Sequence, residues 1–157
     1  MPYQKDTWLY NACVLWEAYC LAIEALLGVV SQSAEFAQIR DGLARLRSEQ
    51  LVSGLSGSQK SVYIGALFKA TARPSCAPML VVTHNSYEAH RLHNDLQTLL
   101  PPDEVRLFPA LETLPHEEVT RTVELTRERL TVLDRLASSD AVLVVAPIQA
   151  LCERIIP

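Results

Sequence analysis

The first part of the chain carries a helical repeat of apolar positions. Apolar side chains recur at alternating steps of four and three residues, which places them on one side of an α-helix. They are Leu9, Cys13, Trp16, Cys20, Ile23, Leu27 and Val30. This repeat predicts an amphipathic helix over residues 9–30, whose apolar side packs on the rest of the protein, docks a partner helix or mediates self-association. A second helical repeat follows at Phe36, Ile39, Leu43 and Leu46.

From residue 50 onward, strand and helix patterns alternate. Four apolar runs contain β-branched or bulky residues and are too short for helices, so they predict strands. These runs span residues 51–52, 79–83, 105–108 and 141–145. Helical patterns lie between them, at residues 61–71, 86–100 and 119–137, and a last helix begins at Pro147. The alternation predicts an α/β fold with an open, mainly parallel sheet and helices on both faces.

The sequence divides into two predicted parts. Residues 1–34 form an α-helical N-terminal extension, and residues 35–157 form the α/β domain. In the predicted helix over residues 119–137, the apolar stripe consists of Val119, Val123, Leu130 and Leu133. The basic residues Arg121, Arg127, Arg129 and Arg135 alternate with acidic ones along the same helix. We therefore expect them to form a solvated face with local ion pairs and not a phosphate-binding patch.

Charge and composition narrow the classes of partner. The chain has 157 residues, of which 49% are hydrophobic and 20% charged, so it has enough apolar residues to fold around a core. Fourteen basic and eighteen acidic side chains give a formal net charge of −4. This balance provides no general attraction to nucleic acid or to an acidic membrane.

Cysteine usage and the N-terminal residues suggest a reducing compartment. Four cysteines are scattered without a C-x-x-C pair, which excludes a zinc ribbon and argues against a disulfide framework, so we expect buried thiols. The longest apolar stretch, residues 12–30, is interrupted by Glu17 and Glu24, which argues against a signal peptide and a membrane span. We expect a cytoplasmic protein.

The string GLSGSQKS at residues 54–61 lies between a predicted strand and a predicted helix. A phosphate-binding P-loop reads G-x-x-x-x-G-K-[S/T], because backbone N–H groups cradle phosphate, the lysine reaches the outer phosphates and the hydroxyl holds Mg²⁺. Gly54, Lys60 and Ser61 match this pattern, and Gly57 adds a further glycine, but Gln59 replaces the second required glycine. A side chain there crowds the loop where backbone must approach phosphate. The string therefore predicts either a structural turn or a loop with residual phosphate binding at Gly54, Gly57, Lys60 and Ser61.

Other catalytic patterns are missing from the sequence. The apolar run at residues 142–145 continues into Ala146 and Pro147 instead of an acidic residue that would organise Mg²⁺. His90 and His93 are three residues apart on a predicted helix, but no further ligand is fixed near them, so we predict no metal site. No G-x-S-x-G elbow is present for a nucleophilic serine. We predict no catalytic residue in this chain.

Four longer strings carry a resemblance to a known family. They are EQLVSGLSGSQKSVYIGALFKAT, LVVTHNSYEAHRLHNDL, VRLFPALETLPHE and VLVVAPIQALCERIIP, in that order within residues 35–157. Together they closely resemble the N-terminal UvrB-like region of bacterial transcription-repair coupling factors (Mfd), over about three quarters of the chain. That family carries a degenerate P-loop at this place, in agreement with Gln59. The excision-repair protein UvrB fits less well, because its P-loop is intact.

The resemblance implies a P-loop NTPase-like fold of the UvrB first-domain type, incomplete because the family draws later strands from downstream sequence. Full-length members are ATP-driven DNA translocases that displace stalled RNA polymerase and recruit UvrA for nucleotide excision repair. Their motor, with its ATP and Mg²⁺, and their contacts with UvrA and RNA polymerase belong to downstream domains. For this chain the resemblance implies a non-catalytic scaffold without a cofactor, which contacts the rest of the UvrB-like module and does not bind DNA directly.

Two alternatives stay open at the level of sequence. One is a small P-loop-like protein that binds phosphate or nucleotide at residues 54–61 without hydrolysis. The other is a truncated gene remnant, since a four-strand piece of a parallel sheet exposes an edge and aggregates.

Overall fold

The computed structural model describes residues 6–45, 49–75, 77–111, 119–138 and 141–153. The chain forms two compact units, Met1–Val52 and Ser53–Pro157. The first unit is helical and the second is an α/β unit.

The first unit contains both helices that the apolar repeats predict. α1 spans Asp6–Ser31 and α2 spans Ala34–Ala44. The chain turns between them because Ser33 caps α2, its Oγ accepting a hydrogen bond from Phe36 N at 3.1 Å. Phe36 is fully buried. After α2, Gln50 Nε2 donates to Ile39 O at 3.2 Å, and its side chain lies over Gly42, where a Cβ would not fit.

The strand predicted at residues 51–52 does not form, so that prediction is wrong. Residues 49–56 have neither helical nor strand structure, and Leu51 is 91% exposed. A strand exists only through pairing with a neighbour, and none of the described strands pairs with this run. Its apolar composition therefore could not decide its structure.

The α/β unit is built on a parallel sheet of three described strands. β1 spans Met79–Thr83, β2 spans Val105–Leu107 and β3 spans Leu143–Pro147, in the spatial order β1-β3-β2. Met79 is in register with Leu143, and so is Val105 on the other side. Three of the four predicted strands are thus confirmed, and the last strand along the chain lies at the centre.

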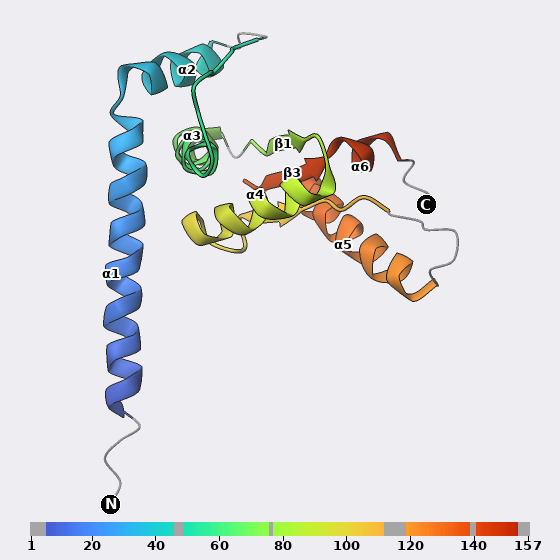
Figure 1. Ribbon diagram of the computed structural model, residues 1–157, viewed down its shortest axis with the longest axis horizontal. Coiled ribbons are helices and arrows are strands. Elements are labelled where there is room, and N and C mark those ends of the chain that lie inside the picture. The colour runs from blue at the N-terminus through green and yellow to red at the C-terminus, as the bar shows by residue number, and fades with distance from the viewer. Residues whose placement is uncertain (1–5, 46–48, 76, 112–118, 139–140, 154–157) are drawn as a thin grey trace, which may run out of the picture. The chain divides into compact units, whose positions relative to one another are not determined.

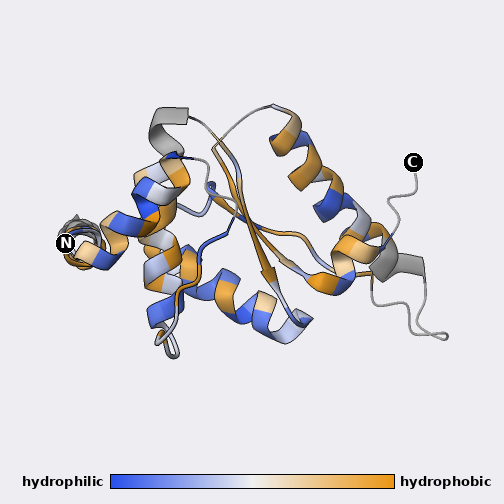
Figure 2. Cartoon of the chain, turned by 90° about the horizontal axis from the view of Figure 1, so that it is seen from above, coloured by the Kyte–Doolittle hydropathy of each residue, from blue (hydrophilic) through white to orange (hydrophobic). Residues whose placement is uncertain are grey.

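Helices cover both faces of this sheet, as the sequence predicted (Figure 1). α3 spans Gln59–Ser75 and α4 spans Ser86–Leu99, while α5 spans Val119–Ala137 and α6 spans Ile148–Cys152. Figure 2 shows α4 and α5 on opposite sides of strands that are mostly hydrophobic. Asn85 caps the N-terminus of α4, since its Oδ1 accepts a hydrogen bond from Glu88 N at 2.8 Å.

The side chains of β3 alternate between the two faces of the sheet and pack into two separate cores. Leu143 and Val145 point toward α3 and α4, and the core on that side contains Phe68, Ala89, Leu96, Leu100, Val105, Leu143 and Val145. Val144 and Ala146 point to the opposite face, where the core contains Phe108, Ala110, Val132, Val142, Val144, Ala146 and Ala150. All five residues of β3 are buried, as expected for a central parallel strand.

α5 buries a different stripe from the one that its sequence predicted. Val132 is 2% exposed, whereas Val123 and Leu130 are 62% and 56% exposed. Of the predicted stripe, Leu133 packs against the core beside Leu136, and the side chain of Val119 lies outside the described part. The helix carries two possible apolar stripes, and the one that faces the sheet is set by tertiary packing.

Arg129 contradicts the prediction that the arginines of α5 stay on a solvated face. Its side chain is 4% exposed and makes hydrogen bonds to Glu153 and to two backbone carbonyls. Burial of a charge is costly unless it is paired and hydrogen-bonded, and here it is both. Arg127 is exposed, as expected, and the side chain of Arg121 lies outside the described part.

Two further expectations concern cysteines and membrane spans. Cys20 and Cys152 are exposed free thiols, so the expectation that they are buried is wrong; the side chains of Cys13 and Cys76 are outside the described part. Among the described residues, no single helix is long and apolar enough to cross a membrane. Within the described part, one pair of neighbouring helical segments is long and apolar enough only when the two are taken together. This pair, Ala18–Ser31 and Ala34–Ala44, is bent by 80°.

Candidate functional site

The loop before α3 and the carboxyl end of β1 border the same cleft in the α/β unit. Its volume is about 470 Å³, which is within the usual range for small-molecule sites. The cleft is lined by Gly57, Lys60, Ser61, Ile64, Val81, Val82, Thr83, His84, Glu88, Arg91, Leu92 and Asp95. Three of the four residues singled out from the sequence thus lie at this cleft, and Gly54 does not line it.

The two loop glycines adopt conformations that other residues rarely take. Gly54 has a φ of 87° and Gly57 a φ of 51°, both in the left-handed region. Glycine reaches this region without steric cost, so these positions explain the glycines of the string without reference to a ligand. The loop is therefore a compact turn that leads into α3.

Gln59 closes the loop on itself. It is the first residue of α3, so its backbone is helical and imposes no strain on a residue with a side chain. Its Oε1 accepts hydrogen bonds from Ser56 N at 3.0 Å and from Ser56 Oγ at 3.3 Å. Gln59 N and Lys60 N are hydrogen-bonded to the loop carbonyls of Ser56 and Gly57. Backbone donors of the kind that hold phosphate in a P-loop are thus already paired within the loop.

Ser61 is turned away from the role that the P-loop pattern gives it. It is 3% exposed, and its Oγ donates to Asp95 Oδ2 on α4 at 2.8 Å. The bond joins α3 to α4. It also holds a carboxylate next to the hydroxyl, where a phosphate would have to approach, and the repulsion between two anions opposes such binding.

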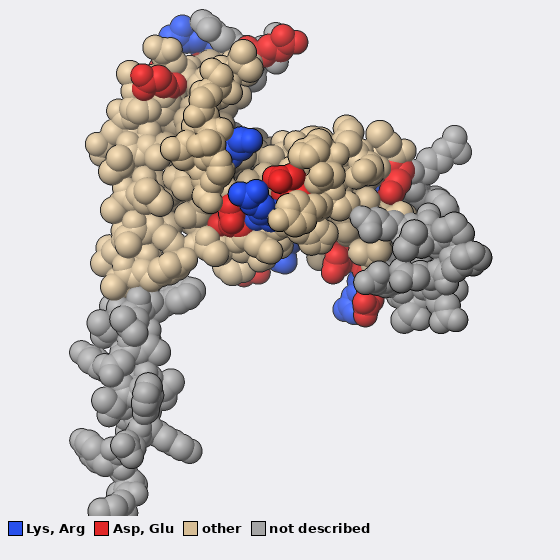
Figure 3. Space-filling view, viewed as in Figure 1, with Lys and Arg blue, Asp and Glu red and all other residues tan. Residues whose placement is uncertain are grey.

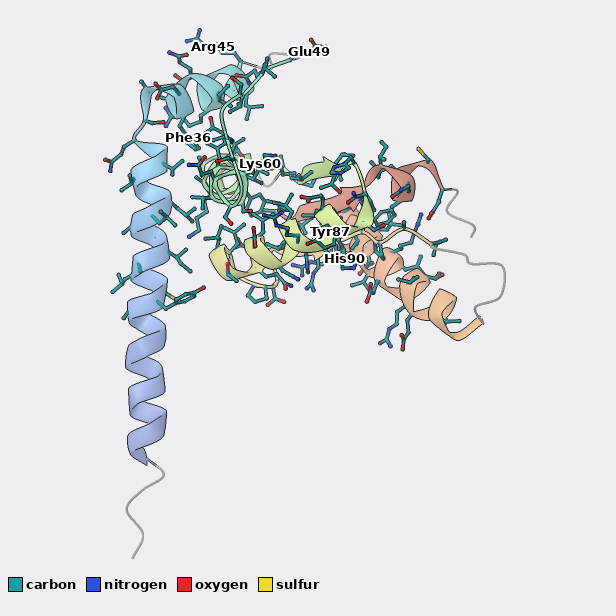
Figure 4. The ribbon with its side chains drawn as sticks, viewed as in Figure 1. Phe36, Arg45, Glu49, Lys60, Tyr87 and His90 are labelled. Atoms are coloured by element: carbon teal, nitrogen blue, oxygen red, sulfur yellow. The ribbon has the colours of Figure 1, made fainter. Side chains whose placement is uncertain are left out.

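The charged side chains around the cleft include both signs. Lys60 and Arg91 are basic and Glu88 and Asp95 are acidic. Figure 3 shows basic and acidic side chains next to one another on this face, over α3 and α4. Figure 4 shows Lys60 on α3, and Tyr87 and His90 on the neighbouring helix α4. A P-loop site needs a strong net positive field for its phosphates, and this mixture does not supply one.

The end of β3 offers no carboxylate for a metal ion. The strand ends at Pro147 and α6 follows at once with Ile148, so no acidic residue stands at its carboxyl end. Among the described residues, no group of three histidine, cysteine, aspartate or glutamate side chains is placed to hold a metal. His90 and His93 lie on α4, where His90 Nδ1 is 2.8 Å from Ser86 O. Burial lowers the pKa of His93, which favours its neutral form.

Two polar contacts of this unit could not be predicted from the sequence. Asp95 meets Ser61 across 34 positions of the chain, and Glu153 meets Arg129 across 24 positions. Neither spacing belongs to a local motif, so only the fold brings these side chains together. Of the two, only the bond between Ser61 and Asp95 lies at the cleft, where it joins α3 to α4.

Comparison with known proteins gives one consistent group of relatives. The chain is 38% identical over 128 residues to the transcription-repair-coupling factor of Bacillus subtilis (strain 168). The aligned residues make up 82% of this chain and 10% of the relative. It is 27% identical over 111 residues to that of Staphylococcus aureus (strain USA300), and 29% identical over 107 residues to that of Staphylococcus haemolyticus (strain JCSC1435). These two matches cover 71% and 68% of this chain, and 9% of each relative.

The match is partial with respect to the relatives. The chain spans about a tenth of their length, in their N-terminal part. No protein-family profile and no solved structure matches the chain. The resemblance found in the sequence is confirmed by these relatives.

Proposed function

We infer that this chain is an N-terminal portion of a transcription-repair coupling factor, and from that premise we propose that it acts as a non-catalytic scaffold of UvrB type in transcription-coupled DNA repair. The premise is supported by 38% identity over 82% of the chain. The scaffold role is supported by a degenerate P-loop in which Gln59 and Ser61 are bonded within the protein.

The closed loop is the observation that carries this proposal. A P-loop works because its backbone N–H groups and hydroxyl are free to meet phosphate and Mg²⁺. Here Ser56 N is bonded to Gln59 and the Ser61 hydroxyl to Asp95. The same residue types shape the turn and join α3 to α4, which supports a structural role for them in this chain.

The remaining parts of the proposal concern the longer protein. ATP and Mg²⁺ would act in motor domains outside these 157 residues, and UvrA and RNA polymerase would be contacted by regions other than this one. The chain itself would contact the rest of the UvrB-like module, would not bind DNA directly, and would act in the cytoplasm. The formal charge of −4 supports the absence of a direct DNA contact.

ATP hydrolysis by the purified chain tests this proposal. We expect phosphate release with ATP and Mg²⁺ to equal that of a blank without protein, since no acidic residue stands directly at the carboxyl end of β3 and the loop is closed. A Lys60→Ala variant is assayed beside the wild type, and a thermal unfolding curve shows that both chains are folded. Turnover that the wild type shows and Lys60→Ala loses would overturn the scaffold role.

A further inference from the structure

The guanidinium of Arg129 is buried where three segments of the α/β unit meet. From α5, its Nη1 donates to Glu153 Oε2 at 2.5 Å and to Pro109 O at 3.2 Å. Its Nη2 donates to Ala150 O at 3.3 Å, and its Cζ lies 4.5 Å from the centre of the Phe108 ring. One side chain thus contacts both the segment after β2 and the segment that contains α6.

Glu153, which follows α6, also connects these two segments. Its Oε2 accepts the bond from Arg129 and also a bond from Leu111 N at 2.8 Å. Leu111 and Glu153 are 42 positions apart in the chain. A single carboxylate oxygen is therefore shared by a backbone amide of one segment and a buried cation. We call Arg129, Glu153 and the backbone groups that they bind the Arg129 clasp.

The physical chemistry of the clasp opposes a half-open state. If the segment at residues 108–111 moves away, Arg129 loses Pro109 O and the Phe108 ring, and Glu153 loses Leu111 N. If residues 150–153 move away, the Arg129 side chain, which is 4% exposed in the intact unit, loses its counter-ion. A buried charge without its partner is strongly unfavourable, so each displacement favours the other.

We propose that the Arg129 clasp is a conformational coupling between residues 108–111 and residues 148–153, so that these two segments are held or released together. Glu153 is 27% exposed at the rim of the clasp, which gives water a route to compete for its carboxylate. The proposal rests on the geometry of the α/β unit and not on the proposed function.

Hydrogen exchange measured by mass spectrometry tests the coupling in the full chain. Arg129→Gln removes the cation, and Arg127→Gln makes the same substitution two residues away at an exposed position of α5. We expect Arg129→Gln to raise exchange about tenfold to a hundredfold at Leu111 and in α6, because hydrogen bonds to charged groups are lost. Exchange in α4 should stay unchanged, and Arg127→Gln should match the wild type.

Three results would overturn the coupling. In the first, only one of the two segments exchanges faster; in the second, neither does. In the third, α4 accelerates as much as the two segments, which would mean a general loss of stability. Glu153→Gln keeps an oxygen that can accept from Leu111 N but removes the charge, so it provides the same comparison if Arg129→Gln does not fold.

Discussion

Buried polar side chains of the α/β unit act as links between helices and loops. Ser61 on α3 reaches Asp95 on α4, and Arg129 on α5 reaches Glu153 after α6. Each pair satisfies groups that would be costly to bury alone. The residue types that first suggest phosphate binding, a serine in a P-loop string and arginines on a helix, are thus used for internal bonds.

Removal of the Ser61 hydroxyl should reduce stability. Ser61→Ala leaves Asp95 without its bond from a buried donor, so we expect the free energy of unfolding to fall by about 1–2 kcal/mol. Urea denaturation followed by circular dichroism measures this change. Ser53→Ala, at an exposed position of the same unit, is the matched control and should change the free energy by less than about 0.5 kcal/mol. Equal values for the two variants would show that the bond to Asp95 contributes nothing.

Residues of the site can be predicted from the sequence only where they lie close together along the chain. The loop string is local, so Gly57, Lys60 and Ser61 can be identified by spacing and do lie at one cleft. Asp95 cannot be identified in this way, because its pairing with Ser61 depends on how α3 packs against α4. The burial of Arg129 has the same origin, since its partners come from two other segments.

At the scale of elements, local patterns predict the described helices and three of the four expected strands, and they fail only for the shortest apolar run. The helix over residues 119–137 and the strand over residues 79–83 have the predicted bounds. The run at residues 51–52 fails because strand formation needs a neighbour that the local sequence does not specify. In α5, residues with the right spacing occur on two sides, and the sheet selects the side with Val132.

A pair of substitutions in α5 tests which side faces the core. Val132→Ala should lower the free energy of unfolding by about 2 kcal/mol, because it leaves a cavity against β3. Leu130→Ala removes more apolar volume but from an exposed position, so its effect should stay within about 0.5 kcal/mol. Thermal or urea unfolding of both variants provides the comparison. A larger loss for Leu130→Ala would mean that α5 packs through the stripe predicted from the sequence.

At the scale of the whole α/β unit, the two edges of the sheet differ. β2 is three residues long and contains Arg106, whose Nη2 lies 3.3 Å from Asp103 Oδ1. β1 is five residues long, contains no charged residue, and has Leu80 and Val82 exposed by 55% and 47%. Among the described strands none pairs with the outer edge of β1. Charged side chains protect edges from pairing with other chains, so β1 is the less protected one.

A charge on β1 should therefore reduce self-association of the purified chain. We expect Val82→Lys to lower the light scattering of concentrated solutions several-fold relative to the wild type, because a lysine at an edge opposes further strand pairing. Val123→Lys adds the same charge at an exposed apolar position of α5, away from the edge. If both variants reduce scattering equally, the effect comes from net charge and the edge of β1 plays no special part.

The central place of β3 determines when the sheet can form during synthesis of the chain. β1 and β2 each pair with β3 and not with one another, and β3 is the last described strand along the chain. A ribosome releases β1 and β2 long before Leu143–Pro147 is available to join them. Until then neither strand has its neighbour, and their apolar side chains remain open to chaperones or to other nascent chains. The sheet is thus assembled in one step, which waits until Leu143–Pro147 has left the ribosome.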